Sequence, residues 1–246
     1  MAAVASLASV LIALSLPWAG VVGLLGVLAL TALIGAAQGF VYTRAQLPSF
    51  VVTLAGLGLW SGLALVIGRT TIPVTAGYEA VGWLKGRDFG VPHAFAFAVF
   101  ATGALVVMLR WSPIGRYIYA IGMGEVAALL SGVPVGRVKI FVLALSGLFA
   151  GLAGMMMVAR TYGGNPTIAD SLLLPSIAAV VIGGTAITGG SGGLGRTIIG
   201  ALTIGVLRVG IAVVGLDPAY EPMAYGLFII VAVALSIDRS ANAIVK

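Results

Sequence analysis

Residues 20–43, GVVGLLGVLALTALIGAAQGFVYT, contain no charged side chain and decide the fold class. A membrane-spanning helix needs about 20 mostly apolar residues, and this stretch is long enough. Other stretches qualify or nearly qualify, namely 1–16, 50–68, 91–109, 139–159, 172–188, 197–215 and 223–237. The sequence therefore predicts an all-α, polytopic transmembrane bundle of about eight spans. We expect one membrane domain over residues 1–246. Pro175, Gly183 and Gly184 predict a broken helix within 172–188.

The composition supports a membrane protein. Of the 246 residues, 61% are hydrophobic and 8% are charged, whereas soluble domains carry about a quarter charged residues. Disorder is excluded, because it requires low hydrophobicity. The chain has no cysteine and one histidine, which excludes thiolate sites and leaves little material for acid–base chemistry. We therefore expect no catalytic residue, no metal site and no cofactor bound by this chain.

The basic residues predict the orientation of the spans, because cytoplasmic loops carry an excess of Lys and Arg. The basic connection 110–138 is placed in the cytoplasm. Alternation then puts eight basic residues inside and four outside, and both termini become cytoplasmic. The four outer residues are Arg69, Lys85, Arg87 and Arg160. The net charge of +6 is thus interpreted as a topology signal, not as a nucleic-acid-binding surface.

Few polar residues lie at the predicted membrane depth: Gln38, Thr53, Ser61, Thr185, Thr188 and Arg208. Arg208 is the charged one. An intramembrane charge is costly and is a functional hypothesis by default, although Arg208 can also extend to the interface or pair with a carbonyl. No acidic residue lies in the middle of a span, so the chain lacks the usual groups of proton-driven carriers.

Small residues recur at helical spacing in two pairs, Gly35/Gly39 and Gly147/Gly151. Such pairs let two helix backbones approach closely within a membrane. Internal packing is the expected use of these glycines, and a dimer contact is the alternative.

The segment 124–132, GEVAALLSG, predicts a very short helix in a cytoplasmic loop. Gly124 can begin it, Gly132 can end it, and Glu125 suits the positive end of the helix dipole. A helix this short is unstable alone in water, so it must pack on its own bundle, on lipid or on a partner. Its central residues, Ala127–Leu130, offer a small apolar surface.

The same loop resembles the permease subunits of bacterial ABC importers for simple sugars, the ribose/xylose type. Gly115-Arg116, Tyr119-Ala120-Ile121-Gly122 and Ser131-Gly132 match that family's loop. Leu47–Leu54 and Ile177–Thr185 resemble two further blocks of the family. The family normally has about ten spans and an upstream block that is not present here. Because Met1–Leu16 also lacks the basic residues that usually flank a first span, we expect a chain that is short at its amino terminus by one helical hairpin.

The resemblance implies a membrane subunit of an ATP-driven importer in the bacterial inner membrane. It implies these partners: an ABC ATPase that binds ATP and Mg, a second permease copy in a homodimer, membrane lipid and a periplasmic sugar-binding protein. The residues expected to couple to the ATPase are Gly124, Glu125, Ala127, Ala128, Leu130, Ser131 and Gly132. Candidates for the translocation path are Gln38, Thr53, Trp60, Ser61, Thr185, Thr188 and Arg208. Candidates for docking the binding protein are Arg69, Lys85 and Arg87.

Rival functions remain at this stage. A branched-chain amino-acid ABC permease would carry a zwitterion, which would give Arg208 a role in binding. An ATP-independent channel or carrier would work without the ATPase. A non-transporting membrane scaffold is a third rival.

Overall fold

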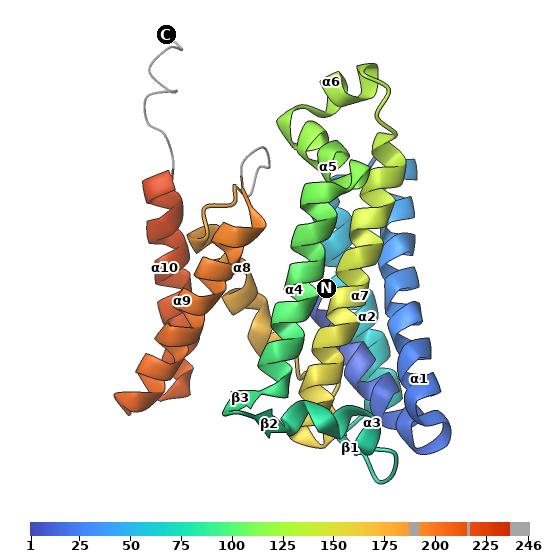
Figure 1. Ribbon diagram of the computed structural model, residues 1–246, viewed down its shortest axis with the longest axis vertical. Helices are drawn as coiled ribbons and strands as arrows, with labels where there is room; N and C mark the ends of the chain where they lie inside the picture. The colour runs from blue at the N-terminus through green and yellow to red at the C-terminus, as the bar shows by residue number, and fades with distance from the viewer. Residues whose placement is uncertain (187–191, 216, 237–246) are drawn as a thin grey trace. The chain divides into compact units, whose positions relative to one another are not determined.

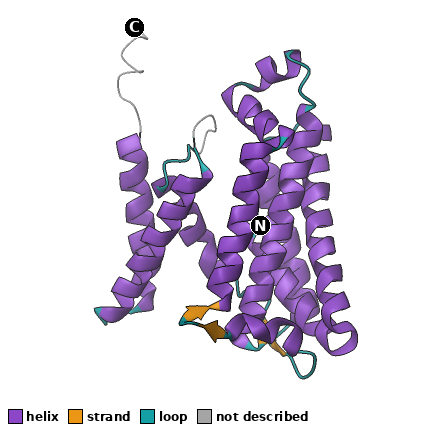
Figure 2. Cartoon of the chain, in the orientation of Figure 1, coloured by secondary structure: helices purple, strands orange, loops and turns teal. Residues whose placement is uncertain are grey.

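The computed structural model describes residues 1–186, 192–215 and 217–236, and most of these residues are helical (Figure 1 and Figure 2). The longer helices are α1 (Ala2–Arg44), α2 (Ser49–Gly68), α4 (His93–Trp111), α7 (Val135–Thr161), α9 (Leu194–Val213) and α10 (Glu221–Ser236). The shorter helices are α3 (Glu79–Gly82), α5 (Pro113–Met123), α6 (Glu125–Leu130) and α8 (Leu173–Ile182). Residues 83–85, 170–172 and 218–220 form 3₁₀ turns. Two-residue strands pair antiparallel, β1 (Ile72–Pro73) with β4 (Gly163–Gly164) and β2 (Arg87–Asp88) with β3 (Val91–Pro92).

Five described helices are long and apolar enough to cross a membrane, namely α1, α2, α4, α7 and α9. This finding confirms the predicted all-α, polytopic class. The apolar α8 has 10 residues. At a rise of about 1.5 Å per residue it reaches about half of the hydrocarbon thickness. It ends at Gly183 and Gly184, the second of which has a φ of 72°, so the described part of 172–188 is a short helix that ends at the predicted glycines.

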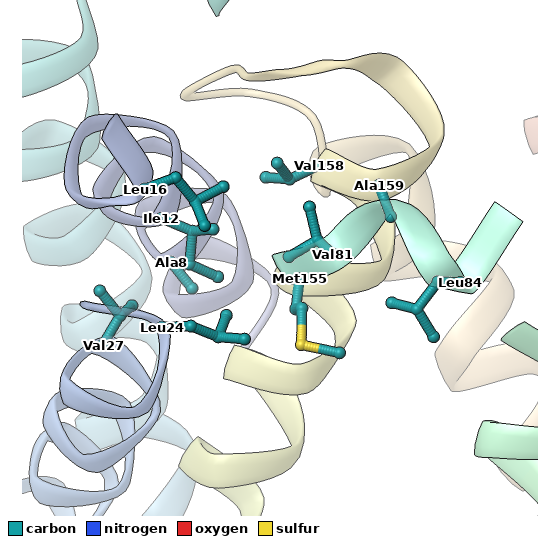
Figure 3. Packing of buried hydrophobic residues seen from close by; sticks show 10 residues of the cluster. All are labelled: Ala8, Ile12, Leu16, Leu24, Val27, Val81, Leu84, Met155, Val158 and Ala159. Carbon is teal, nitrogen blue, oxygen red and sulfur yellow. The ribbon is translucent and has the colours of Figure 1, made fainter. Parts of the chain in front are cut away.

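Helix α1 consists of two apolar halves that meet at Gly20, whose φ of 51° and ψ of −126° are not helical. The predicted spans 1–16 and 20–43 correspond to these halves. Leu16 of the first half and Leu24 of the second lie in one buried cluster, which α3, α7 and the turn at 83–85 complete (Figure 3). Residues 3–10 are buried throughout, so the first half of α1 is central to this packing.

The two glycine pairs of the sequence lie at the contact between α1 and α7. A Cβ on Gly147 would lie 3.1 Å from the Cα of Gly35, and one on Gly39 would lie 2.8 Å from the Cα of Ile140. These distances leave no room for a side chain, so the helices approach backbone to backbone. The expectation of internal packing is confirmed. The contacts also show that the end of α1 lies beside the start of α7.

The described chain forms two compact units. Unit 1 comprises residues 1–118 and 128–170, and unit 2 comprises residues 119–127 and those from Ser171 onward. In unit 2, buried residues of α8, α9 and α10 form a separate core of Ala178, Ala179, Ile204 and Tyr225. Gly200 of α9 lies directly against the backbone oxygen of Ala179, which permits the close packing of α8 and α9.

One end of unit 1 is closed by a loop layer, which we define as residues 69–92 and 162–169. The pairing of β1 with β4 ties its two segments together, and the Asn165 amide donates to the Thr71 hydroxyl at 2.9 Å. The Tyr78 hydroxyl donates to the Ala159 carbonyl at 2.5 Å, and the Tyr78 and Tyr162 rings stack at 4.8 Å. Helices α4 and α7 each have one end at this layer and run from it to the opposite end of unit 1 (Figure 1). In the chain, α5 follows α4 and α6 precedes α7.

Candidate functional site

The short helix predicted within residues 124–132 is present as α6, Glu125–Leu130. It ends in a paired turn: Gly132 N–H donates to Leu129 at 3.0 Å, and Val133 N–H donates to Ala128 at 3.0 Å. This is the double hydrogen bond of the Schellman motif, which requires a left-handed residue after the helix. Gly132 supplies that conformation with a φ of 81°. Gly132 therefore ends the helix, as its sequence position predicted.

The exposed apolar surface of α6 differs from the one expected. Ala128 is only 4% exposed, so it packs inward instead of belonging to the exposed surface. Leu129 and Leu130 are exposed, and so are Val126 and Met123, which the sequence analysis did not include. We call Met123, Val126, Leu129 and Leu130 the α6 knob. Val126 and Leu130, four positions apart, lie on one face of α6, and Met123 is the last residue of α5.

A groove of about 510 Å³ lies between α1 and α2. Its lining is mostly apolar, with Gln38 of α1 and Trp60 of α2 as the polar exceptions. Gln38 is 8% exposed, and its Nε2 lies against Gly56, where a Cβ would clash with it. The same Cβ would be 3.5 Å from Trp60 Nε1. That indole nitrogen is buried and is the one buried side-chain polar atom without a hydrogen-bond partner among the described residues.

Two other predicted path residues of unit 1 lie outside this groove. The Thr53 hydroxyl donates within its own helix, to Ser49 at 3.0 Å and to Phe50 at 3.0 Å. Ser61 is half-buried and is not part of the groove lining. The structure thus brings together Gln38 and Trp60 and adds Gly56, which sequence reasoning missed because a glycine gives no chemical signal by itself.

In unit 2, Arg208 is paired with an acidic residue. Its Nε lies 3.3 Å from Glu221 Oε2, and the two side chains are 49% and 17% exposed. Tyr225 donates its hydroxyl to the same oxygen at 3.1 Å. A backbone carbonyl was the partner that the sequence suggested for Arg208. The partner is Glu221, which begins α10 and lies within reach of α9.

The two remaining path candidates are Thr185 and Thr188. Thr185 follows α8, and its hydroxyl lies 3.5 Å from that of Thr197 in α9. Thr188 lies outside the described residues. Among the described residues, no group of three or more His, Cys, Asp or Glu side chains could hold a metal ion.

The predicted docking residues all belong to the loop layer. Arg69 and Arg87 are exposed, whereas Lys85 Nζ lies 3.6 Å from the centre of the Tyr162 ring. This cation–π contact ties Lys85 to the layer itself. Sequence reasoning missed Phe89, which is fully exposed at the tip of the β2–β3 hairpin with a φ of 51°. His93 pins this hairpin, because its two ring nitrogens lie 2.7 Å from Trp83 O and 3.0 Å from Asp88 Oδ2.

Comparison with known families assigns the chain. Residues 1–233 match the family described as the permease component of the branched-chain amino acid transport system. The chain belongs to this permease family. Relatives include the ribose import permease protein RbsC of Bacillus subtilis strain 168, 35% identical over 208 residues. RbsC of Escherichia coli K12 is 36% identical over 211 residues, and the fructose import permease protein FrcC of Rhizobium meliloti is 34% identical over 223 residues. No solved structure matches the chain.

Each match covers a larger share of this chain than of the relative. They include 83% of this permease and 64% of the B. subtilis protein, 84% and 65% for the E. coli protein, and 83% and 59% for FrcC. The permease thus spans less than two thirds of the length of these relatives. With its apolar helices, it is a multi-pass inner-membrane protein, and its family consists of transport components, not enzymes.

Proposed function

We propose that this chain is the transmembrane subunit of an ATP-driven importer for a monosaccharide. The observation that carries the proposal is that relatives 34–36% identical over most of the chain are named ribose and fructose import permeases. The sugar reaches the permease from a binding protein outside the membrane. The permease then opens toward the cytoplasm when its ATPase partner changes state.

The α6 knob supports the assignment of an ATPase contact at this loop. Met123, Val126, Leu129 and Leu130 are exposed apolar side chains in this loop, and exposed apolar surface is typical of a protein contact. The buried Ala128 and the Gly132 turn hold the helix in place, so it can transmit force from a moving partner. ATP and Mg belong to that partner, and this chain binds neither.

We infer eight spans with both termini in the cytoplasm, which puts the α6 end inside and the loop layer outside. Excess basic residues on the inner side support this orientation. The permease works as a homodimer, and the binding protein docks on Arg69, Arg87 and the projecting Phe89. Lys85 is less available for docking the binding protein, because its ammonium group contacts the Tyr162 ring.

The family description favours one second candidate, import of a branched-chain amino acid. A zwitterionic cargo needs charged partners, because a buried charge is costly unless it is paired. Arg208 is engaged by Glu221, and the α1–α2 groove has no ionisable side chain in its lining. Both observations support a neutral cargo over an amino acid.

The test is sugar-stimulated ATP hydrolysis by the assembled system. The permease is reconstituted in nanodiscs with its ATPase and binding protein, and ribose, fructose and leucine are compared as cargo. We expect a monosaccharide to raise hydrolysis and leucine to leave it unchanged. Stimulation by leucine alone would favour the amino-acid permease. Sugar flux into vesicles without nucleotide would favour an ATP-independent channel or carrier.

A further inference from the structure

The Trp60 side chain lines the α1–α2 groove, and its indole nitrogen is a hydrogen-bond donor that the protein does not satisfy. Trp60 Nε1 is buried and has no partner, and a buried donor without a partner is costly and calls for an explanation. Gln38 is 8% exposed and contributes an amide, which can both donate and accept hydrogen bonds. Both side chains line the same groove, with Gly56 between them.

We propose that this groove is a monosaccharide-binding subsite of the permease, a proposal that rests on the proposed function and locates its cargo. The Trp60 indole N–H donates to a sugar oxygen, and the Gln38 amide pairs with a neighbouring hydroxyl. The apolar remainder of the lining contacts the C–H faces of the sugar. The groove volume of about 510 Å³ falls within the range of small-molecule pockets, about 300–1,000 Å³.

The chemistry of the groove favours a sugar over other occupants. A lipid acyl chain has no hydrogen-bond acceptor, so it would leave Trp60 Nε1 unpaired. An amino acid carries two charges, and none of the lining residues is ionisable. A neutral polyhydroxyl compound satisfies the donor and suits the mostly apolar lining without a charged partner. A subsite with two polar side chains also holds its cargo weakly, as release requires.

Gly56 keeps the subsite open. A Cβ at this position would clash with Gln38 Nε2 and would contact Trp60 Nε1, so even alanine would displace the amide. The groove lies near the end of α1. Gln38 precedes the end of α1 by six residues, and that end lies beside the start of α7. The subsite therefore belongs to the half of unit 1 opposite the loop layer, where cargo would leave toward the α6 end.

The test measures sugar binding to the purified full chain in nanodiscs by saturation-transfer NMR, with ribose, fructose and leucine as probes. Trp60→Phe keeps the aromatic ring and removes the N–H, and Gln38→Leu keeps the size and removes the amide. Each is expected to weaken sugar binding about three- to tenfold, the effect of one lost hydrogen bond. Gly56→Ala should abolish binding. Trp18→Phe makes the same chemical change at a residue that is 93% exposed and should have no effect.

Several results would overturn the subsite. These are unchanged sugar affinity in both Trp60→Phe and Gln38→Leu, no sugar binding by the native chain, or occupation of the groove by lipid or by water that sugar does not displace. Transport by the assembled importer separates this failure from failure of the proposed function. If the native system imports sugar and both variants do so with unchanged KM and rate, the subsite is wrong and the function stands. If the native system imports no sugar, the function itself is wrong.

Discussion

Arg208 and Glu221 form an ion pair that joins α9 to α10, with Nε 3.3 Å from Oε2. The pair is asymmetric, because the Glu221 side chain is 17% exposed and that of Arg208 is 49% exposed. Tyr225, which is 2% exposed, adds a hydrogen bond to the same carboxylate oxygen. Arg208 therefore pairs with an acidic residue of its own unit, and we assign it a structural role.

The asymmetry of this pair predicts unequal effects of removing its two partners. Arg208→Met leaves a largely buried carboxylate with one neutral donor, and we expect a loss of about 1–3 kcal/mol of stability. Glu221→Gln leaves an arginine that is half exposed and can extend to the membrane interface, and it keeps an acceptor for Tyr225, so its cost should be smaller. Thermal unfolding in nanodiscs measures both. Arg160→Met, at an exposed position, is the control, and equal losses in the two variants would contradict the asymmetry.

The α6 knob predicts a separation between folding and coupling. Leu130, 83% exposed, can accept a charge without disturbing the core, whereas Ala128, 4% exposed, cannot. We expect Leu130→Glu to insert normally and to weaken association with the ATPase about tenfold or more, since charging the centre of an apolar contact is costly. Leu130→Met keeps the apolar surface and should behave like the native protein. Co-purification and ATP hydrolysis are the measurements. Native coupling in Leu130→Glu would show that the α6 knob is not the ATPase contact.

The close contact between α1 and α7 predicts opposite effects for two glycines of one helix. A Cβ at Gly35 would clash with the Leu143 carbonyl, whereas a Cβ at Gly26 has nothing within 4 Å. Gly35→Ala should therefore lower the melting temperature by forcing the helices apart. Gly26→Ala should leave it unchanged or raise it, because alanine stabilises a helix interior by about 0.5–1 kcal/mol over glycine. Equal behaviour of the two variants would show that the two helices separate without cost.

Tyr78 predicts how the loop layer responds to alkaline pH. Burial raises the pKa of Tyr78 above its ordinary value of 10.0, although the positive charge of Lys85 opposes the rise. The folded chain therefore holds this proton more tightly than the unfolded chain does. The resulting stabilisation is complete below pH 10 and is lost as the pH rises through the folded-state pKa.

Tyr78→Phe tests this pH dependence, because it removes the ionisable group and the hydrogen bond to Ala159. At neutral pH we expect a cost of about 0.5–1.5 kcal/mol for that bond. Above pH 10 the native melting temperature should fall more steeply than that of the variant. Parallel curves for the two proteins would mean that Tyr78 titrates alike in the folded and unfolded chains.

Much of the fold could be predicted because its causes are local in the chain. Uncharged apolar runs identified the long helices, and Gly132 correctly marked the end of α6. The pairs Gly35/Gly39 and Gly147/Gly151 even indicated close internal packing, since a small residue every four positions lines one helix face. In each case the deciding residues lie within one continuous stretch of the chain.

The site depended on contacts between helices that are separate in the sequence. Gln38 and Trp60 were both candidates, yet nothing in the sequence distinguished them from Thr53, whose hydroxyl bonds within its own helix. Arg208 had no acidic partner in the sequence, and Glu221 becomes that partner only where α9 and α10 meet. Ala128 and Leu130 looked equivalent, and only burial separated them.

The sequence by itself determined that the chain is a polytopic bundle of helices, where its apolar runs lie and which permease loop it resembles, because hydrophobicity and helix-ending glycines act over a few neighbouring residues. The tertiary structure alone decided that Arg208 pairs with Glu221, that Gln38 and Trp60 share a groove and which side chains of α6 face outward. A polar group acquires its partner only when two helix faces meet, and that meeting depends on packing along the whole length of both helices.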